Sequence, residues 1–362
     1  MAGTVPVAAC GRRKGTGFPG YAFIANETGR SLSAVDLSLF RVVRRVSFNS
    51  EPSAVIAPPA HSSVFVLTPR TGSVHEIDAE SLRIRRSSRV ADAAVSMRVG
   101  PDGESIWVLA SNPGCLVRLP LDNLRPSERI RFSGTPDDFD ITAETAQAAV
   151  ITQGSHGIAV ADLKRASVQR TIDAPALPRI ARFRKDGRLL LAGQREGRDL
   201  TIFEVSSGKA VVTLPLALEP VHFCSTPDGG QVFITGPGMD AVAVVYPYRT
   251  EVAQTLLAGR SPAAMAVTGN RGLVFITNPD SGEVSVLDVA AHRTIAVVAV
   301  GAEPRHVLIT PDAQYALVLN QRSGDVAVIR VAAVIDRRTK MAPLFTMIPV
   351  GSKPVSAAVR RT

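Results

Sequence analysis

Hydrophobic and polar residues alternate in short segments along the whole chain, and residues 261–302 show the pattern in full. An apolar segment at 261–268 is followed by a turn, and 273–278 is a second apolar run rich in strand-forming residues. After a Pro-Asp-Ser-Gly turn, residues 283–289 alternate with period two, and a fourth segment covers 294–300. The pattern predicts four short antiparallel strands in 42 residues, which is one blade of a β-propeller.

The same pattern returns every 42 residues, and three positions of the repeat keep this period. The first is usually proline and holds Pro52, Ala94, Pro136, Pro178, Pro220, Pro262, Pro304 and, after a longer step, Pro354. The second is usually acidic and holds Asp36, Asp78, Pro120, Asp162, Glu204, Tyr246, Asp288 and Arg330. The third closes the second apolar run and holds Asn26, Thr68, Ala110, Thr152, Gln194, Gly236, Asn278 and Asn320. Such repetition is typical of propellers and solenoids, and we expect the recurring acid to serve a turn or an inter-blade hydrogen bond.

The number of repeats predicts an all-β propeller of eight four-stranded blades, with seven blades as the alternative. The second apolar run occurs eight times, first near Tyr21, and the chain ends on a first strand. The two ends should therefore share one blade, with three strands from 21–48 and one from 353–361. Such closure removes the free sheet edges that an open ring would otherwise expose. The step of 50 residues before Pro354 predicts an insertion between about 331 and 343.

Composition changes this picture little, but charge adds a feature. The chain is 45% hydrophobic and only 5% aromatic, and it has no apolar run long enough to span a membrane. The net charge of +9 is concentrated at the ends, because 1–50 and 330–362 each carry seven Lys and Arg against two acids and one acid. A basic patch attracts anionic lipid or nucleic acid, or it is a solvated arginine rim on an outer strand. Aromatic residues are not interleaved with these charges, so we expect no nucleic-acid partner.

The N-terminal segment resembles a lipoprotein signal. Val7-Ala8-Ala9-Cys10 precedes a glycine and a basic run, which is the arrangement around an acylated cysteine. Only nine residues precede Cys10, fewer than an export signal requires. Either the start lies upstream or the match is accidental. We therefore assign 1–20 to a disordered tail or the remnant of an export signal, and 21–362 to a single propeller domain. The expected location is periplasmic or at the cell surface with possible membrane anchoring through Cys10, and a cytoplasmic location stays open.

Several segments resemble the YVTN-repeat β-propellers. The matching residues are the runs 273–278 and 283–288, and Gly301-x-x-Pro304 followed by 310–312. The resemblance covers about residues 20–362 and implies a propeller of a mostly bacterial, often exported family that is commonly seven-bladed. It also implies a relationship to lactonase-type propellers.

Candidate binding residues follow the repeat proline, where first strands enter the central channel. Most blades have small or apolar residues at these positions, and the exceptions are Asp137, Asp138, Arg179, His222, Arg305 and His306. Two imidazoles could bind a metal or haem, or act as acid and base; alternatively they bond a neighbouring blade. The aspartates could hold a cation or pair with Arg179 across the blade gap. The arginines could hold a carboxylate or phosphate, or they are channel-lining charges satisfied by water and acids.

Three functional hypotheses follow. The preferred one is a monomeric, non-enzymatic scaffold without a cofactor, which binds a protein, a glycan or a small anionic ligand at the channel mouth. The second is a lactonase-like hydrolase in which His222 or His306 is the base and the arginines hold an anionic substrate. The third is an eight-bladed periplasmic propeller that binds haem or a metal; the sequence has no Cys-x-x-Cys-His site, so haem would be non-covalent.

Overall fold

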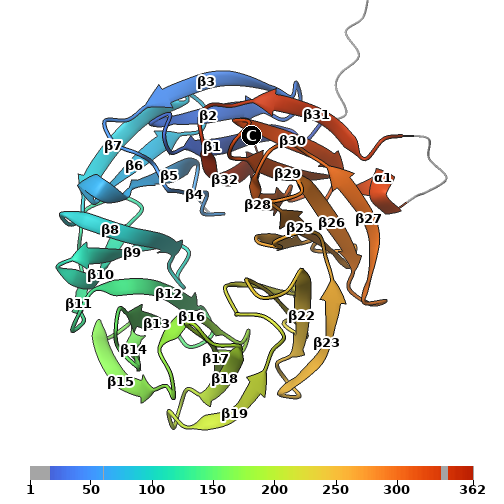
Figure 1. Cartoon of the computed structure of the whole chain (residues 1–362). Coiled ribbons are helices and arrows are strands. Elements are labelled where there is room, and N and C mark those ends of the chain that lie inside the picture. The colour runs from blue at the N-terminus through green and yellow to red at the C-terminus, as the bar shows by residue number, and fades with distance from the viewer. Residues whose placement is uncertain (1–16, 60, 336–340, 362) are drawn as a thin grey trace, which may run out of the picture.

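The computed structural model describes residues 17–59, 61–335 and 341–361, which form a closed ring of small β-sheets around a central channel (Figure 1). The ring has eight four-stranded sheets, and every strand pair is antiparallel. The prediction of eight blades is confirmed and seven blades are excluded. We name the blades A to H in ring order and call the strand beside the channel the inner strand.

The first four blades have the following strands. Blade A contains β1 (Gly20–Asn26), β2 (Ser31–Asp36), β3 (Arg41–Ser47) and the inner strand β32 (Pro354–Arg361). Blade B contains β4 (Ala54–Ile56), β5 (Ser63–Thr68), β6 (Ser73–Asp78) and β7 (Arg83–Arg89), with the 3-10 turn η1 (Pro69–Thr71). Blade C contains β8 (Ala93–Val99), β9 (Ser105–Asn112), β10 (Gly114–Pro120) and β11 (Arg129–Arg131). Blade D contains β12 (Pro136–Thr142), β13 (Gln147–Thr152), β14 (Gly157–Asp162) and β15 (Ser167–Asp173).

The other four blades repeat this order. Blade E contains β16 (Pro178–Phe183), β17 (Leu189–Gln194), β18 (Asp199–Glu204) and β19 (Ala210–Pro215). Blade F contains β20 (His222–Ser225), β21 (Val232–Thr235), β22 (Ala241–Tyr246) and β23 (Glu251–Leu257). Blade G contains β24 (Met265–Val267), β25 (Leu273–Asn278), β26 (Glu283–Asp288) and β27 (Arg293–Ala299). Blade H contains β28 (Pro304–Ile309), β29 (Tyr315–Asn320), β30 (Asp325–Arg330) and β31 (Leu344–Pro349), with the short helix α1 (Val331–Ile335) between the last two.

The ring closes as the repeat arithmetic predicts. The C-terminal strand β32 pairs antiparallel with β1, so that Tyr21 lies opposite Arg360 and Phe23 opposite Ala358. The predicted insertion lies where expected, and its first residues form α1. One detail differs from the sequence prediction, since the inner strand of blade G is only Met265–Val267. The preceding residues form the linker from blade F, in which Ser261 has φ of 55°.

The core lies between neighbouring blades and repeats with the same period. One position on each second strand is fully buried, with an exposed fraction of at most 1%; it holds Phe23, Phe65, Trp107, Ala149, Leu191, Phe233, Phe275 and Leu317. Phe23 of blade A packs in one cluster with Val64 and Val66 of blade B. Full burial of a large apolar side chain stabilises the fold by about 1.5–3 kcal/mol. Each such residue therefore contributes to the association of two sheets.

The recurring acid at the end of the third strand holds a turn. Oδ1 of Asp36 accepts hydrogen bonds from the backbone N–H groups of Ser38 (2.8 Å) and Leu39 (3.0 Å). Asp162 and Asp288 accept the same two bonds from the residues two and three positions later. The residue four positions after each of these aspartates has a positive φ of 52°, 49° and 47°. The predicted structural role of this acid in a turn is confirmed.

The recurring asparagine connects neighbouring blades. Nδ2 of Asn320 in blade H donates to the carbonyl of Val300 in blade G at 2.9 Å. Nδ2 of Asn26 in blade A donates to the carbonyl of Val350 in blade H at 3.1 Å. Both asparagines are fully buried, so these bonds are shielded from water and join the second strands of blades A and H to the preceding blade.

In the part of the chain that the structure describes, no helix has the length and apolarity that crossing a bilayer requires.

Candidate functional site

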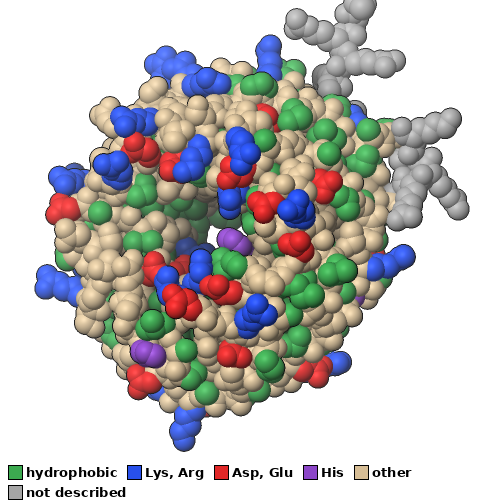
Figure 2. Space-filling view, in the orientation of Figure 1, with side chains coloured by type: hydrophobic (Ala, Val, Ile, Leu, Met, Phe, Trp, Pro, Cys, Tyr) green, Lys and Arg blue, Asp and Glu red, His purple; other side chains and the backbone are tan. Residues whose placement is uncertain are grey.

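A hollow of about 610 Å³ lies at the channel mouth on the face formed by the linkers into the inner strands and the loops between second and third strands. It is lined by Arg179 of blade E, His222 of blade F and Arg305 of blade H, together with the loop 236–240 and the linker 261–263. Figure 2 shows basic, acidic and histidine side chains around the opening of the channel. The structure therefore brings three of the six candidate residues together.

A β-bulge explains why the residue after the repeat proline reaches the mouth. The pairing between first and second strands shifts between Pro178 and Ile180 and between Pro304 and His306. The residues left out of the ladder are Arg179 and Arg305. A bulge re-aims the side chain of the extra residue, so both arginines are directed to the rim of the channel. The same shift leaves Asp137 unpaired between Pro136 and Asp138 in blade D, as its backbone pairing shows.

Each arginine of the hollow is held by one carboxylate. Nη1 of Arg179 donates to Oε1 of Glu219 at 2.6 Å. Nε of Arg305 donates to Oε1 of Glu303 at 2.7 Å, and Glu303 also contacts Arg322 at 3.5 Å. A guanidinium has five N–H donors. The carboxylates thus orient both arginines while leaving further donors available in the hollow.

His222 has a positively charged environment. The crowded channel wall, and then the guanidinium groups of Arg179, Arg182 and Arg305, lower the pKa of its imidazole below the ordinary value. The ring is exposed to the channel and makes no hydrogen bond to any described residue. His222 is therefore a neutral imidazole near pH 7, with its ring nitrogens available to a ligand.

His306 occupies the same register as His222 but does not line the hollow. Its half-buried ring lies on β28, and burial lowers its pKa to about 4. It also lacks a hydrogen-bond partner among the described residues. The alternative prediction, that each histidine hydrogen-bonds a neighbouring blade, is not met, because neither ring forms such a bond to a described residue. The two imidazoles are thus neutral groups two blades apart on the channel side of the ring.

The aspartates are engaged in ion pairs, although not with the predicted partner. Oδ2 of Asp138 contacts Nη1 of Arg182 at 2.5 Å, and Oδ2 of Asp137 contacts Nη2 of Arg195 at 2.5 Å. Both pairs cross from blade D to blade E, as expected of a pair that spans the blade gap. Arg179 is not involved, because it bonds Glu219 on the other side of its own blade. The carboxylates therefore do not enter the hollow.

A belt of charges deeper in the channel was not predicted. Arg98 on β8 donates to the carbonyl of Phe139 at 2.8 Å and lies 3.7 Å from Asp140. Asp140 in turn accepts a hydrogen bond from the backbone N–H of Phe183 in blade E. A signal was available, since Arg98, Asp140 and Arg182 all stand four residues after the repeat position at 94, 136 and 178. The carboxylates that hold the two mouth arginines lie in linkers, outside the positions considered.

The described residues contain no group of three or more His, Cys, Asp or Glu side chains that could hold a metal ion. Cys115 is buried and Cys224 half-buried, and both are free thiols. Cys10, the possible lipidation site, lies outside the described residues. The chemistry of the mouth is thus that of guanidinium groups and a neutral imidazole, which suits recognition of an anion more than capture of a bare metal ion by protein ligands alone.

No protein-family model and no curated protein matches this chain. Solved structures do match. The chain is similar to dihydro-heme d1 dehydrogenase NirN in complex with DHE, with a TM-score of 0.78 and 16% identity over 96% of this chain and 76% of that one. It is also similar to apo AztD from Citrobacter koseri (TM-score 0.70, 13% identity, 94% and 98% covered). A third similar structure is the hydrazine synthase of Kuenenia stuttgartiensis (TM-score 0.61, 20% identity, 78% and 96% covered). At these identities the likeness shows the fold alone.

Proposed function

We propose that this protein is a non-enzymatic binding propeller that holds an anionic ligand at its channel mouth. The observation that carries the proposal is the convergence of Arg179, His222 and Arg305, from three different blades, on one hollow of about 610 Å³. This volume lies within the range of about 300–1,000 Å³ that is usual for small-molecule sites. A ligand with carboxylate or phosphate groups fits such a lining.

The arrangement favours binding an anion because the guanidinium groups are oriented in advance. Glu219 and Glu303 each occupy one part of an arginine, so little side-chain freedom is lost when a ligand takes the remaining donors. Asp240, the acid among the described lining residues, accepts a hydrogen bond from the N–H of Ser261 at 2.9 Å. It supplies an acceptor that can discriminate among anions by their hydroxyl groups.

Binding is favoured over lactone hydrolysis by the surroundings of His222. A general base is usually oriented by a third group, most often a carboxylate. Here the charged groups that act on the imidazole are three arginines, and no acid bonds its ring within the described residues. These cations weaken it as a base. The lactonase-like alternative therefore has less support than the binding scaffold.

The test is a binding titration by calorimetry with inorganic phosphate, citrate and a sugar phosphate as probes. Arg305→Gln should weaken the binding of an anion by about tenfold to a hundredfold, since a hydrogen bond to a charged group contributes about 1.5–3 kcal/mol. Arg322→Gln is the matched control, because Arg322 also contacts Glu303 but does not line the hollow. Equal loss in both variants, or unaltered binding in Arg305→Gln, would contradict the proposal.

The wider assignment is part of the same proposal. We propose an exported, YVTN-type scaffold whose channel-mouth face meets its ligand outside the cytoplasm, with anchoring through Cys10 as one route of attachment. The resemblance of the repeat motifs and of the Val7-Ala8-Ala9-Cys10 segment supports it. Fractionation of cells that express the chain and its Cys10→Ser variant tests the anchor. Recovery of both proteins in the same fraction would contradict attachment through Cys10.

A second candidate ligand is a non-covalently bound tetrapyrrole. It is favoured by two neutral imidazoles, His222 and His306, that lack partners among the described residues, and by the likeness of the fold to NirN. His222 would be the residue that ligates a metal in such a ring, while Arg179 and Arg305 would hold its carboxylates. When bound, the group would supply light absorption and redox chemistry. Titration with haemin should then give a Soret band that His222→Ala abolishes; no band in the wild type would dismiss this candidate.

A further inference from the structure

The outer strands of the ring divide into a basic part and a nearly uncharged part. The outer strands of blades A, B and C are β3, β7 and β11, which together hold nine arginines and no acid. The outer strands of the other five blades hold two arginines, one aspartate and one glutamate. β3, β7 and β11 are consecutive around the ring in Figure 1, and Figure 2 shows basic side chains gathered along that upper left part of the outline.

Protection of sheet edges does not explain this distribution. Charged residues on an edge strand prevent pairing with another chain. However, all eight outer strands are edges of their sheets, and five of them have almost no charge. β19 and β31, for example, contain no charged residue at all. The arginines of blades A to C therefore require a reason that applies to that side of the ring only.

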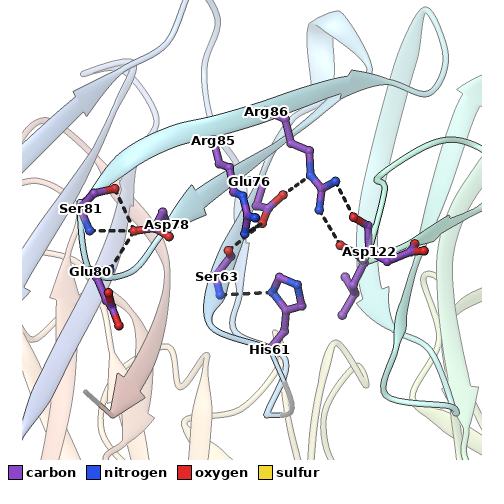
Figure 3. A network of polar contacts seen from close by, with 10 residues as sticks. His61, Ser63, Glu76, Asp78, Glu80, Ser81, Arg85, Arg86 and Asp122 are labelled. Atoms are coloured by element: carbon purple, nitrogen blue, oxygen red, sulfur yellow. Dashed lines mark hydrogen bonds and ion pairs between the residues drawn. The ribbon is translucent and has the colours of Figure 1, made fainter.

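Most of these arginines have no acidic partner. Arg85 and Arg86 contact the buried carboxylate of Glu76, as Figure 3 shows, and Arg89 pairs with Asp92. The six others form no ion pair with any described residue; they are Arg41, Arg44, Arg45, Arg83, Arg129 and Arg131. All six are exposed. The basic rim, as we call these six residues, is thus a positive surface that spans three blades.

We propose that the basic rim docks the propeller, side wall first, on an anionic lipid bilayer. Aliphatic side chains stand among the arginines: Leu39 is 55% exposed, Val43 39% and Ile84 41%. Basic residues alternating with exposed aliphatic ones suit the boundary between head groups and acyl chains. Nucleic acid fits less well, since β3, β7 and β11 contain no aromatic residue on which a base could stack.

The first described residues lie close to the turn that leads into β3. The described chain begins at Gly17 in blade A, and the carbonyl of Phe18 accepts a hydrogen bond from Oγ of Ser38, in the turn that leads into β3. The preceding sequence carries Arg12, Arg13 and Lys14. In the sequence, a short basic run therefore precedes blade A. The proposal is independent of the ligand at the channel mouth, which lies on a different surface.

The test is sedimentation of the full chain with vesicles of phosphatidylcholine, with and without phosphatidylglycerol. We expect binding only to the anionic vesicles, weakening as salt screens the charges. Replacing Arg41, Arg44 and Arg45 by Gln should lower the affinity roughly a hundredfold, because each basic residue near an anionic surface contributes about tenfold or less. The matched control replaces Arg165, Arg249 and Arg293, which are exposed at the outer sides of blades D, F and G, and should bind like the wild type.

Three outcomes would overturn the proposal. The wild type could fail to sediment with anionic vesicles at low salt, or the control could lose as much affinity as the rim variant, which would indicate net charge alone. A duplex or single-stranded DNA oligonucleotide could also bind through the same arginines more tightly than the vesicles at equal salt. The rim would then be a nucleic-acid surface. Circular dichroism of both triple variants establishes that they are folded before binding is compared.

Discussion

Arg86 forms an ion pair with the fully buried carboxylate of Glu76 on the neighbouring strand of blade B, and Figure 3 shows that its guanidinium also reaches Asp122 of blade C. The remaining donors of Arg86 bond two carbonyls of blade C, those of Leu121 at 2.7 Å and Asp122 at 2.6 Å. Oγ of Ser63 donates to the same carboxylate at 2.7 Å. One guanidinium thus neutralises a buried charge and connects two sheets.

We expect Arg86→Leu to destabilise the protein by about 3–5 kcal/mol, because it leaves the carboxylate of Glu76 buried without its main partner. Arg85→Leu is the control. Arg85 also reaches Glu76, at 3.6 Å, but its side chain is 57% exposed, so its loss should cost at most about 1 kcal/mol. Urea unfolding followed by fluorescence measures both. Similar losses in the two variants would show that the inter-blade position of Arg86 is unimportant.

Asn320→Ala should lower the free energy of unfolding by about 1–3 kcal/mol, since the carbonyl of Val300 would be buried without its donor. Asn270→Ala is the comparison, because Asn270 is exposed in a turn of blade G and surface changes usually stay within about 0.5 kcal/mol. The midpoint of thermal unfolding reports both. A shift for Asn320→Ala no larger than that for Asn270→Ala would argue against the inter-blade role of the asparagine.

Stability should fall on acidification through His306. Its pKa is lowered from 6.5 to about 4 by burial, so the unfolded state binds a proton first as the pH falls. The stabilisation is present above about pH 6.5 and is lost progressively as the pH falls towards about 4. It amounts to about 2–4 kcal/mol. Urea unfolding of the wild type and of His306→Gln between these limits measures it. The free energy of unfolding of the variant should fall less over this pH range than that of the wild type. An equal fall in both proteins would contradict the role of His306.

Cys224 should react slowly with thiol reagents, because burial raises the pKa of its thiol from 9.0 to about 11. At pH 8 the thiolate fraction is then roughly a hundredfold below that of an unperturbed thiol. Labelling of a Cys10→Ser, Cys115→Ala protein with a chromogenic disulfide isolates this residue. Reaction at the rate of free cysteine would mean that the channel wall around Cys224 is open to solvent and reagent.

Much of the fold could be predicted because the relevant signals are local and repeated. The second strands were expected to begin at Ser63, Ser105 and Leu189, among others, and they begin there. Blade closure followed from counting strands. The inner strand of blade G was predicted too long, since the residues from Ser261 to Ala264 look like a strand in sequence but serve as the linker between sheets.

Less of the candidate site could be predicted. The position after the repeat proline was singled out as a candidate, and the structure brings Arg179, His222 and Arg305 to one hollow. Whether they bind a ligand remains a prediction. An ion pair with Arg179 was one of the two uses predicted for Asp138, and its partner is Arg182 instead. Arg179 and Arg182 lie three residues apart on β16. The bulge at Arg179 turns its side chain away from the direction that Arg182 takes, and this difference is not visible in the sequence.

The repeat pattern alone was sufficient to predict the all-β architecture, the number of blades and the pairing of the two chain ends. These depend on period-two patterns and turn residues within about 42 residues, which the repeat presents many times over. Which charges meet depends on the folded ring, because the partners come from different blades and are selected by the curvature of the ring and by bulges. Asp138 and Arg182 are 44 residues apart, and Arg86 finds its carbonyls on the next blade. Ion pairs across the gap between two sheets do not follow the period of the repeat, so the sequence carries no signal that identifies the partners.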